Sequence, residues 1–184
     1  MPLILSIDTS TRGCSVALHQ NEQLLASYDL LADKSTSGML TTLVKNIADH
    51  AGVQLSDIDA FAVAQGPGSY TGLRIAVSTA KGLCFSLDKP LLAVNTLHAL
   101  VLQIKDFFPH NYLFCPMLDA RRMEVYCAIF DQNEQYIAPT HAKIIDNESF
   151  VELLEQYKIV FFGDGAAKCK AILGHNKNSY FSSY

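Results

Sequence analysis

The sequence predicts an α/β protein made of two similar lobes, each with a mixed β-sheet flanked by helices. Apolar runs of strand length alternate along the chain with amphipathic runs of helix length. A strand–turn–strand–turn–strand pattern occurs near the N-terminus and again 111 residues later, where Asp119 takes the place of Asp8. Because fewer elements follow the second copy, we expect residues 1–109 to form a full lobe and residues 110–184 a smaller, incomplete one. Chance similarity between two β-meanders is the alternative explanation of the repeat.

Composition and charge limit the functions open to the chain. Of its 184 residues, 49% are hydrophobic, which is enough for a substantial core, and the formal net charge is −4. This excludes a surface that is basic overall, so if nucleic acid is involved, another subunit supplies most of the charge that binds phosphate. The N-terminus lacks the basic region of a signal peptide, and no apolar run is long enough to cross a bilayer. We therefore expect a cytoplasmic protein that does not contact membranes.

The cysteines indicate a reducing compartment. There are five of them, an odd number, and they form no CxxC pair. Several lie inside apolar patterns, so we expect buried free thiols rather than disulfides or metal ligands.

The first lobe begins with three strands, expected at residues 3–8, 14–19 and 23–29. A helix follows, with cap candidates at Ser35 to Ser37 and a stop at Gly52. Its apolar stripe faces either the core of the lobe or a partner helix, and the pattern alone leaves both open. The stripe consists of Met39, Leu40, Leu43, Val44, Ile47 and Ala51.

A glycine-rich loop at residues 66–74 separates an expected strand at 60–64 from an expected helix at 73–87. Amide groups at the start of such a helix can hold an anion. The spacing matches neither phosphate motif, because Thr71 stands where a dinucleotide loop needs glycine and no Gly-Lys-Ser/Thr ends the loop. A structural loop that lets helix and strand pack closely is the other interpretation. Ser69 has no nearby base in the sequence that would make it a nucleophile.

The remaining elements repeat the first lobe in outline. A strand at 91–94 leads to a helix at 97–107, with Thr96 as its N-cap and Pro109 after its end. The second meander is expected at 113–119, 124–130 and 135–138, followed by a helix at 150–157, a strand at 159–162, a turn at 163–165 and a helix at 166–173. The tail from Gly174 has no clear element, as if a closing strand or helix were missing.

The sequence contains little recognisable chemistry. The six histidines are scattered without metal-binding spacing, and there is no GxSxG motif. Asp8 and Asp119 could hold Mg²⁺ and ATP between the lobes, which keeps a small-molecule kinase or ATPase as an alternative function.

Four blocks in order resemble the bacterial TsaB family, also called YeaZ. They are residues 5–10 (LSIDTS), 66–75 (GPGSYTGLRI) continuing to 80–83 (AKGL), 96–97 (TL) and 119–126 (DARRMEVY). The resemblance extends from residue 3 to about residue 165. It implies an actin-like ATPase fold with two RNase-H-like lobes.

The resemblance also implies an accessory role without catalytic or metal-binding residues. TsaB pairs with its paralogue TsaD, and the ATPase TsaE joins them. Together they place a threonylcarbamoyl group on the adenosine beside the anticodon of tRNAs that read codons starting with A. TsaB forms a homodimer when alone, tRNA is reached only through the complex, and ATP or ADP with Mg²⁺ belongs to the complex rather than to this subunit.

Three groups of residues follow from the resemblance. The partner interface is expected at Leu40, Leu43, Val44, Ile47, Ile75, Ala76, Thr79 and Leu83. The loop of the family motif contains Gly66, Gly68, Ser69, Thr71, Gly72 and Arg74. A vestigial nucleotide site is expected at Asp8, Thr9, Asp119, Arg121, Gly163 and Gly165.

Overall fold

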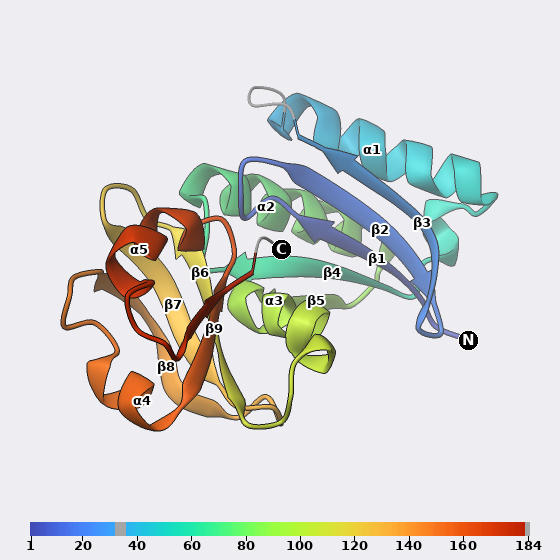
Figure 1. Cartoon of the computed structure of the whole chain (residues 1–184). Helices are drawn as coiled ribbons and strands as arrows, with labels where there is room; N and C mark the ends of the chain where they lie inside the picture. The colour runs from blue at the N-terminus through green and yellow to red at the C-terminus, as the bar shows by residue number, and fades with distance from the viewer. Residues whose placement is uncertain (32–35, 183–184) are drawn as a thin grey trace. The chain divides into compact units, whose positions relative to one another are not determined.

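The chain folds into two compact units, which meet in the sequence between Asn95 and Thr96. A computed structural model describes residues 1–31 and 36–182 (Figure 1). Ser35 lies outside these residues, and the side chains of Thr36 and Ser37 are outside the description too, so the expected helix cap falls there.

The first unit is built on a five-stranded mixed sheet. The meander consists of β1 (Leu3–Asp8), β2 (Cys14–Gln20) and β3 (Gln23–Leu30), all antiparallel. Two further strands, β4 (Ala60–Gly66) and β5 (Leu91–Asn95), add in parallel to β1, giving the order β3-β2-β1-β4-β5. Side chains of β1 alternate between buried and half-buried, as a strand with one face on a core requires.

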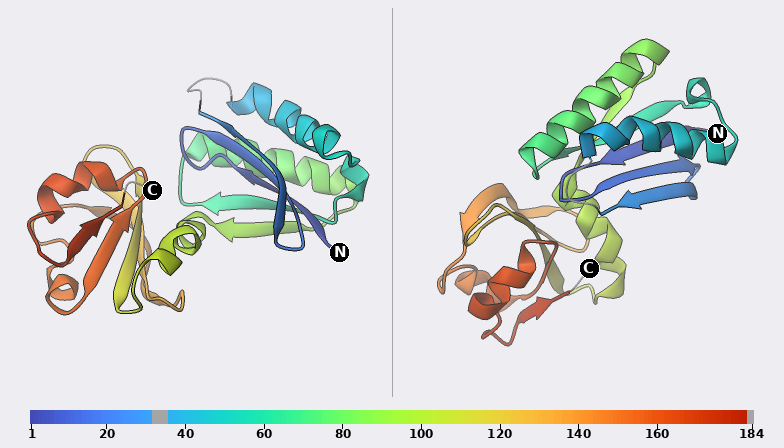
Figure 2. Two further views of the ribbon diagram at one scale, coloured as in Figure 1. Left: turned by 45° about the vertical axis from the view of Figure 1, so that its right-hand side comes forward. Right: turned by 90° about the horizontal axis from the view of Figure 1, so that it is seen from above.

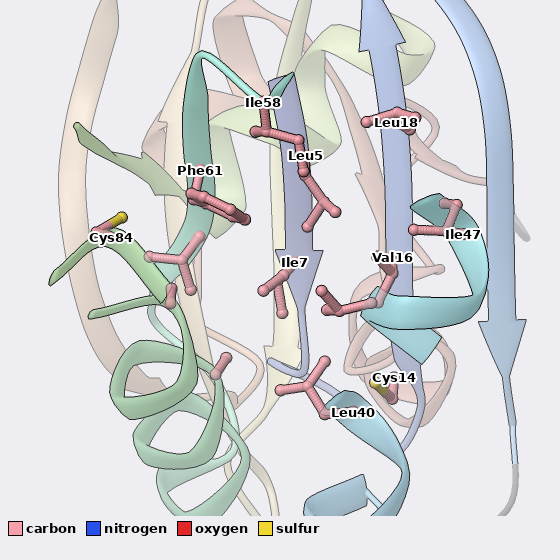
Figure 3. Close-up of a cluster of buried hydrophobic side chains, with 14 of the residues drawn as sticks. Leu5, Ile7, Cys14, Val16, Leu18, Leu40, Ile47, Ile58, Phe61 and Cys84 are labelled. Carbon is pink, nitrogen blue, oxygen red and sulfur yellow. The ribbon is translucent and has the colours of Figure 1, made fainter. Parts of the chain in front are cut away.

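Two long helices cover one face of this sheet. They are α1 (Thr36–Ala51) and α2 (Tyr70–Leu87), which lie side by side in Figure 2, and the short 3₁₀ helix η1 (Leu55–Asp57) follows α1. Figure 3 shows how Leu5, Ile7 and Val16 from the sheet meet Leu40 from α1. The apolar stripe of α1 therefore belongs to the core of its own unit.

The second unit repeats the sheet of the first. Its strands are β6 (Tyr112–Asp119), β7 (Glu124–Phe130), β8 (Tyr136–Ile144), β9 (Lys158–Phe162) and β10 (Ser179–Phe181). The order β8-β7-β6-β9-β10 and every parallel or antiparallel pairing match those of β3-β2-β1-β4-β5. The predicted two-lobe duplication is confirmed. The expectation of a missing strand was wrong, because β10 closes the sheet from within the polar and aromatic tail.

The second unit differs from the first in its helices. In the places of α1 and α2 it has α4 (Val151–Gln156) and α5 (Ala166–Leu173), with 6 and 8 residues against 16 and 18. The other face of its sheet is covered by α3 (Thr96–Ile104), and the 3₁₀ helix η2 (Lys105–Phe107) follows it. The shortfall of this lobe therefore lies in helix length, not in the sheet.

Because α3 packs with the second unit, the boundary between the units lies before this helix and not after it. Leu97, Val101 and Ile104 are buried against Phe114 and Phe130 of the second sheet. The boundary after residue 109 expected from the sequence lies too late, because a helix that follows β5 in the sequence packs with the strands that come after it.

Candidate functional site

The glycine loop packs directly against the first turn of the chain. A Cβ atom on Gly72 would stand 2.0 Å from the carbonyl oxygen of Thr9, and one on Gly68 would stand 2.4 Å from that of Ser10. No side chain fits at either place, so the backbones of the loop and the turn are in contact. Gly66 and Gly68 also have φ of +105° and +155°, which only glycine adopts readily.

Hydrogen bonds close this contact. The amide of Ser69 donates to the carbonyl of Ser10 at 2.6 Å, and the Thr9 hydroxyl donates to the carbonyl of Gly72 at 2.7 Å. The Ser69 hydroxyl accepts from the amide of Gly72 at 3.3 Å and so caps α2. Since these groups already have partners within the chain, the geometry favours the structural interpretation of the loop over an anion site, and Ser69 acts as a helix cap.

The second unit contains the same arrangement. A Cβ atom on Gly163 would stand 2.5 Å from the carbonyl oxygen of Met117, and one on Gly165 would stand 2.8 Å from the carbonyl carbon of Leu118. The carboxylate of Asp164 accepts from the amide of Asp119 at 2.9 Å. In each unit, the backbone of a glycine-containing turn thus contacts the backbone at the end of the first strand.

The aspartates at the ends of these two strands also correspond. Asp8 accepts from the amide of Ser10 at 2.7 Å, and Asp119 accepts from the amide of Arg121 at 3.0 Å. Asp119 differs in forming an ion pair with Lys168. A carboxylate that a lysine neutralises is a poor ligand for Mg²⁺.

The residues expected for a vestigial nucleotide site are thus brought together in two groups. Asp8 and Thr9 lie beside the glycine loop of the first unit, whereas Asp119 and Arg121 lie beside Gly163 and Gly165 in the second.

Half of the expected partner interface is wrong. Leu40, Val44, Ile47 and Ala76 have at most 1% of their surface exposed and lie in the core of the first unit. The sequence pattern identified the apolar face of each helix correctly, but that face covers the sheet. The other expected residues, Leu43, Ile75, Thr79 and Leu83, are half-buried at the margins of the helices.

The outward side of α2 carries residues that sequence reasoning missed. Phe85 is 92% exposed and Tyr70 is 74% exposed, and the Arg74 guanidinium lies over the Tyr70 ring at 5.3 Å. An open groove of about 420 Å³ runs along the same helix. Its lining consists of Tyr70, Thr71, Arg74, Ile75, Ser78 and Thr79. The signal available in the sequence was helical spacing, which places Tyr70, Arg74, Ser78 and Phe85 opposite the buried alanines.

The cysteines and the possible metal ligands form no metal-binding cluster in the part of the chain that the structure describes. All five cysteines are free and buried, as predicted, and burial raises the pKa of the Cys115 thiol well above its usual value. Within the described residues, no three histidine, cysteine or acidic side chains gather in a way that could hold a metal ion. In the same part of the chain, no helix is long and apolar enough to cross a membrane.

Comparisons with known proteins match the chain to TsaB proteins and to the related transferase TsaD. A family model described as "TsaD: tRNA N6-adenosine threonylcarbamoyltransferase" matches residues 30–178. A Bacillus subtilis protein named "tRNA threonylcarbamoyladenosine biosynthesis protein TsaB" is 31% identical over 92% of this chain and 74% of its own length. An Escherichia coli protein of the same name is 35% identical over 73% of this chain and 57% of its own length.

Solved structures extend the likeness to the fold. The structure of a Pseudomonas aeruginosa protein, described by its similarity to the peptidase YeaZ, has a TM-score of 0.84 and 27% sequence identity. The match covers all of this chain and 84% of the other. It confirms the fold that the four sequence blocks implied.

Proposed function

The chain belongs to the TsaB family, and from this we propose that it is a non-catalytic subunit of a tRNA threonylcarbamoyl transferase complex in the cytoplasm. Its relatives are named as tRNA threonylcarbamoyladenosine biosynthesis proteins. The family model that matches most of the chain describes the transferase TsaD. In this proposal TsaD attaches the threonylcarbamoyl group to the adenosine beside the anticodon of tRNAs that read A-starting codons, and the present chain supports it.

The observation that carries the proposal is the outer face of α2, which we define as Tyr70, Thr71, Arg74, Ile75, Ser78, Thr79 and Phe85. On this regular helix of 18 residues, Tyr70 lines an open groove, and Phe85 is almost fully exposed. Aromatic and arginine side chains are enriched in protein interfaces, where a few such residues provide most of the binding energy.

The choice of TsaD as partner rests on equivalent helices in the two proteins. Because this chain and TsaD match the same family model, both are expected to present a helix in the position of α2. We assign the heterodimer contact with TsaD to the outer face of α2 and to the half-buried Leu43 and Leu83 at the margins. A homodimer of the isolated chain uses the same face, and TsaE joins the heterodimer.

Contacts within the chain support the proposal that this subunit alone does not bind nucleotide tightly. Lys168 neutralises Asp119, and the hydroxyl of Ser69 and the amides of Ser69 and Gly72 have partners within the chain. ATP or ADP with Mg²⁺ is therefore assigned to the complex. The same contacts give no support to a small-molecule kinase of this fold.

Reconstitution tests the proposal. Unmodified tRNA is incubated with TsaD, TsaE, ATP and the threonylcarbamoyl donor, with and without this chain, and the modified adenosine is measured by mass spectrometry. We expect modification only when the chain is present, and no ATP hydrolysis or transfer by the chain alone. Equal modification without the chain, or turnover by the isolated chain, would overturn the proposal.

A further inference from the structure

The turn between β6 and β7 contains two consecutive arginines in an unusual backbone conformation. Arg121 has φ of +70° and Arg122 has φ of +43°, in the left-handed region that glycine, asparagine and aspartate normally occupy. Both residues are exposed. The turn between β2 and β3 has the same pair of positive φ values at Asn21 and Glu22, as tight hairpin turns require, but there one of the two residues is an asparagine.

The duplicated fold does not require this conformation. The first unit makes the corresponding connection between β1 and β2 with residues 9–13, and none of these has a positive φ. The two sheets share their order and pairing, so the strained arginines are a feature of the second unit and not of the shared architecture.

Hydrogen bonds from Lys168 on α5 fix the turn between β6 and β7. Its ammonium group donates to the Asp119 carboxylate, to the carbonyl of Glu124 at 2.7 Å and to that of Arg121 at 3.4 Å. Within the turn, the amide of Ala120 donates to the carbonyl of Glu124 at 3.1 Å, and the amide of Glu124 donates to that of Arg121 at 3.1 Å. The backbone that carries both arginines is therefore fixed before any ligand arrives.

The guanidinium groups themselves are not used by the fold. In residues 1–31 and 36–182, neither Arg121 nor Arg122 forms an ion pair or a side-chain hydrogen bond. Of the acidic residues around the turn, Asp119 pairs with Lys168, and Asp164 accepts from the amide of Asp119. Neither arginine therefore serves as the partner of a carboxylate among the described residues.

We propose that Arg121 and Arg122 form a rigid phosphate-binding tip that contacts the RNA backbone, an inference that rests on the proposed role in tRNA modification. Guanidinium groups bind phosphate oxygens through paired hydrogen bonds, and rigid presentation lowers the entropy cost of binding. An exposed tip fits a phosphodiester backbone that passes over it, whereas a free nucleotide needs a concave pocket. The two arginines add a local positive charge to a chain whose net charge is −4.

The double variant Arg121→Asn/Arg122→Gly tests this role and separates it from a structural one. Asparagine and glycine adopt positive φ at little cost, so the variant should melt at the same or a higher temperature than the wild type. Its affinity for RNA should nevertheless fall. The matched control, Lys170→Gln/Lys177→Gln, removes two exposed charges from the same unit and should bind RNA as the wild type does.

Binding is measured by fluorescence anisotropy with an unmodified transcript of a tRNA that reads A-starting codons, over a salt series. The full chain is used alone at low ionic strength and then in complex with TsaD. We expect affinity to fall about tenfold or more, and the slope of log K against log salt to flatten by roughly 1.4, since each phosphate contact with a single strand contributes about 0.7. The control variant should keep the wild-type slope.

The possible outcomes separate this inference from the proposed function. Failure of the wild-type chain to assemble with TsaD, seen by size-exclusion chromatography, counts against the proposed function. Intact assembly with equal RNA affinity for the variant and the wild type overturns the arginine tip, as does the absence of RNA binding by both the chain and its complex. A variant that loses affinity for ATP and Mg²⁺ in calorimetry, but keeps its affinity for RNA, overturns it in favour of a nucleotide site.

Discussion

Gly72 and Gly82 both lie on α2, yet their surroundings predict opposite effects of the same substitution. A Cβ atom on Gly72 would stand 2.0 Å from the carbonyl oxygen of Thr9, so Gly72→Ala forces the helix away from the first turn. We expect a loss of about 2–3 kcal/mol in the free energy of unfolding, as overpacking typically causes. The measurement is urea denaturation followed by circular dichroism.

Gly82→Ala is the matched control for this prediction. Apart from its chain neighbours and the backbone of its own helix, no described atom lies within 4 Å of a Cβ atom built on Gly82, which lies inside the helix. The alanine variant should therefore be about 0.5–1 kcal/mol more stable than the wild type, because alanine loses less backbone entropy than glycine on folding. Equal effects of the two substitutions would contradict the close contact between loop and turn.

Phe85 provides the corresponding prediction for the proposed interface. Phe85 is 92% exposed, so Phe85→Ser should leave the stability of the isolated chain unchanged. Its affinity for TsaD should fall about tenfold or more, the effect typical of losing an aromatic anchor. Calorimetric titration with TsaD measures the affinity, and Phe107→Ser, at a phenylalanine that is 82% exposed in the second unit, should bind as the wild type does.

At the level of elements, polar contacts connect α3 and η2 to the turn between β7 and β8. Glu134 in that turn forms an ion pair with Lys105 and a hydrogen bond with His98, with 3.0 Å between His98 Nε2 and the carboxylate. The hydrogen bond from Lys105, and then that from His98, lowers the pKa of the Glu134 carboxyl. The same contact with Glu134 raises the pKa of the Lys105 ammonium.

These shifts define the pH range in which the contact stabilises the fold. Because the pKa of Glu134 is lower in the folded chain, its contribution is present above the unfolded value of about 4.3 and is lost as the pH falls through the folded pKa. Because the pKa of Lys105 is raised, its contribution is present below about 10.4 and is lost as the pH rises through the folded pKa. Glu134→Gln should therefore be less stable than the wild type near neutral pH and equally stable once the acid is protonated.

Urea denaturation at a series of pH values measures this difference. The second variant, Lys105→Gln, should reproduce most of the loss at neutral pH, and the double variant should lose little more than either single one, since the two groups share one contact. A constant difference between the wild type and Glu134→Gln across the acid range would contradict the ionic origin of the effect.

Local patterns predicted the elements well where apolar periodicity was strong. The first strand and the helix at 166–173 were placed with the bounds that the structure has. The periodicity of α1 and α2 also showed which residues lie on one face, but it could not show whether a sheet or a partner helix covers that face. The assignment of Leu40 and Ala76 to an interface failed for this reason.

Non-local contacts account for what the sequence did not reveal. The strand β10 has only three residues, all half-buried, and it forms by pairing in parallel with β9, so its own sequence carries little signal. The reason for the glycines at 68 and 72 likewise lies in the backbone of residues 9 and 10, far away along the chain. The role of Lys168 beneath the β6–β7 turn depends on a contact across 49 residues to Asp119.

For the molecule as a whole, duplication explains what the two units share and where they differ. Both keep five strands in one order and a glycine turn pressed onto the end of the first strand. The first unit has long helices with an exposed aromatic face, which suits the proposed pairing with another subunit. The second has shorter helices and two exposed arginines in the turn between β6 and β7. The same sheet thus carries a different surface in each unit.

The boundary between the units leads to a prediction about fragments of the chain. Residues 96–184 include α3, whose Leu97, Val101 and Ile104 cover Phe114 and Phe130, so this fragment should fold cooperatively on its own. The fragment 110–184 follows the boundary expected from the sequence and lacks this helix. It would expose a large apolar face of the sheet to water, and we expect it to aggregate or remain unfolded. Circular dichroism during heating, together with the dispersion of amide resonances, distinguishes the two states.

A variant of the longer fragment separates the effect of the helix from that of length. Val101→Asp places a charge at a fully buried position of α3 while all residues from 96 onward remain. Burial of an unpaired carboxylate is strongly unfavourable, so this variant should behave as the shorter fragment does. If residues 110–184 fold as cooperatively as residues 96–184, α3 does not contribute to the core of the second unit, and the boundary belongs after residue 109.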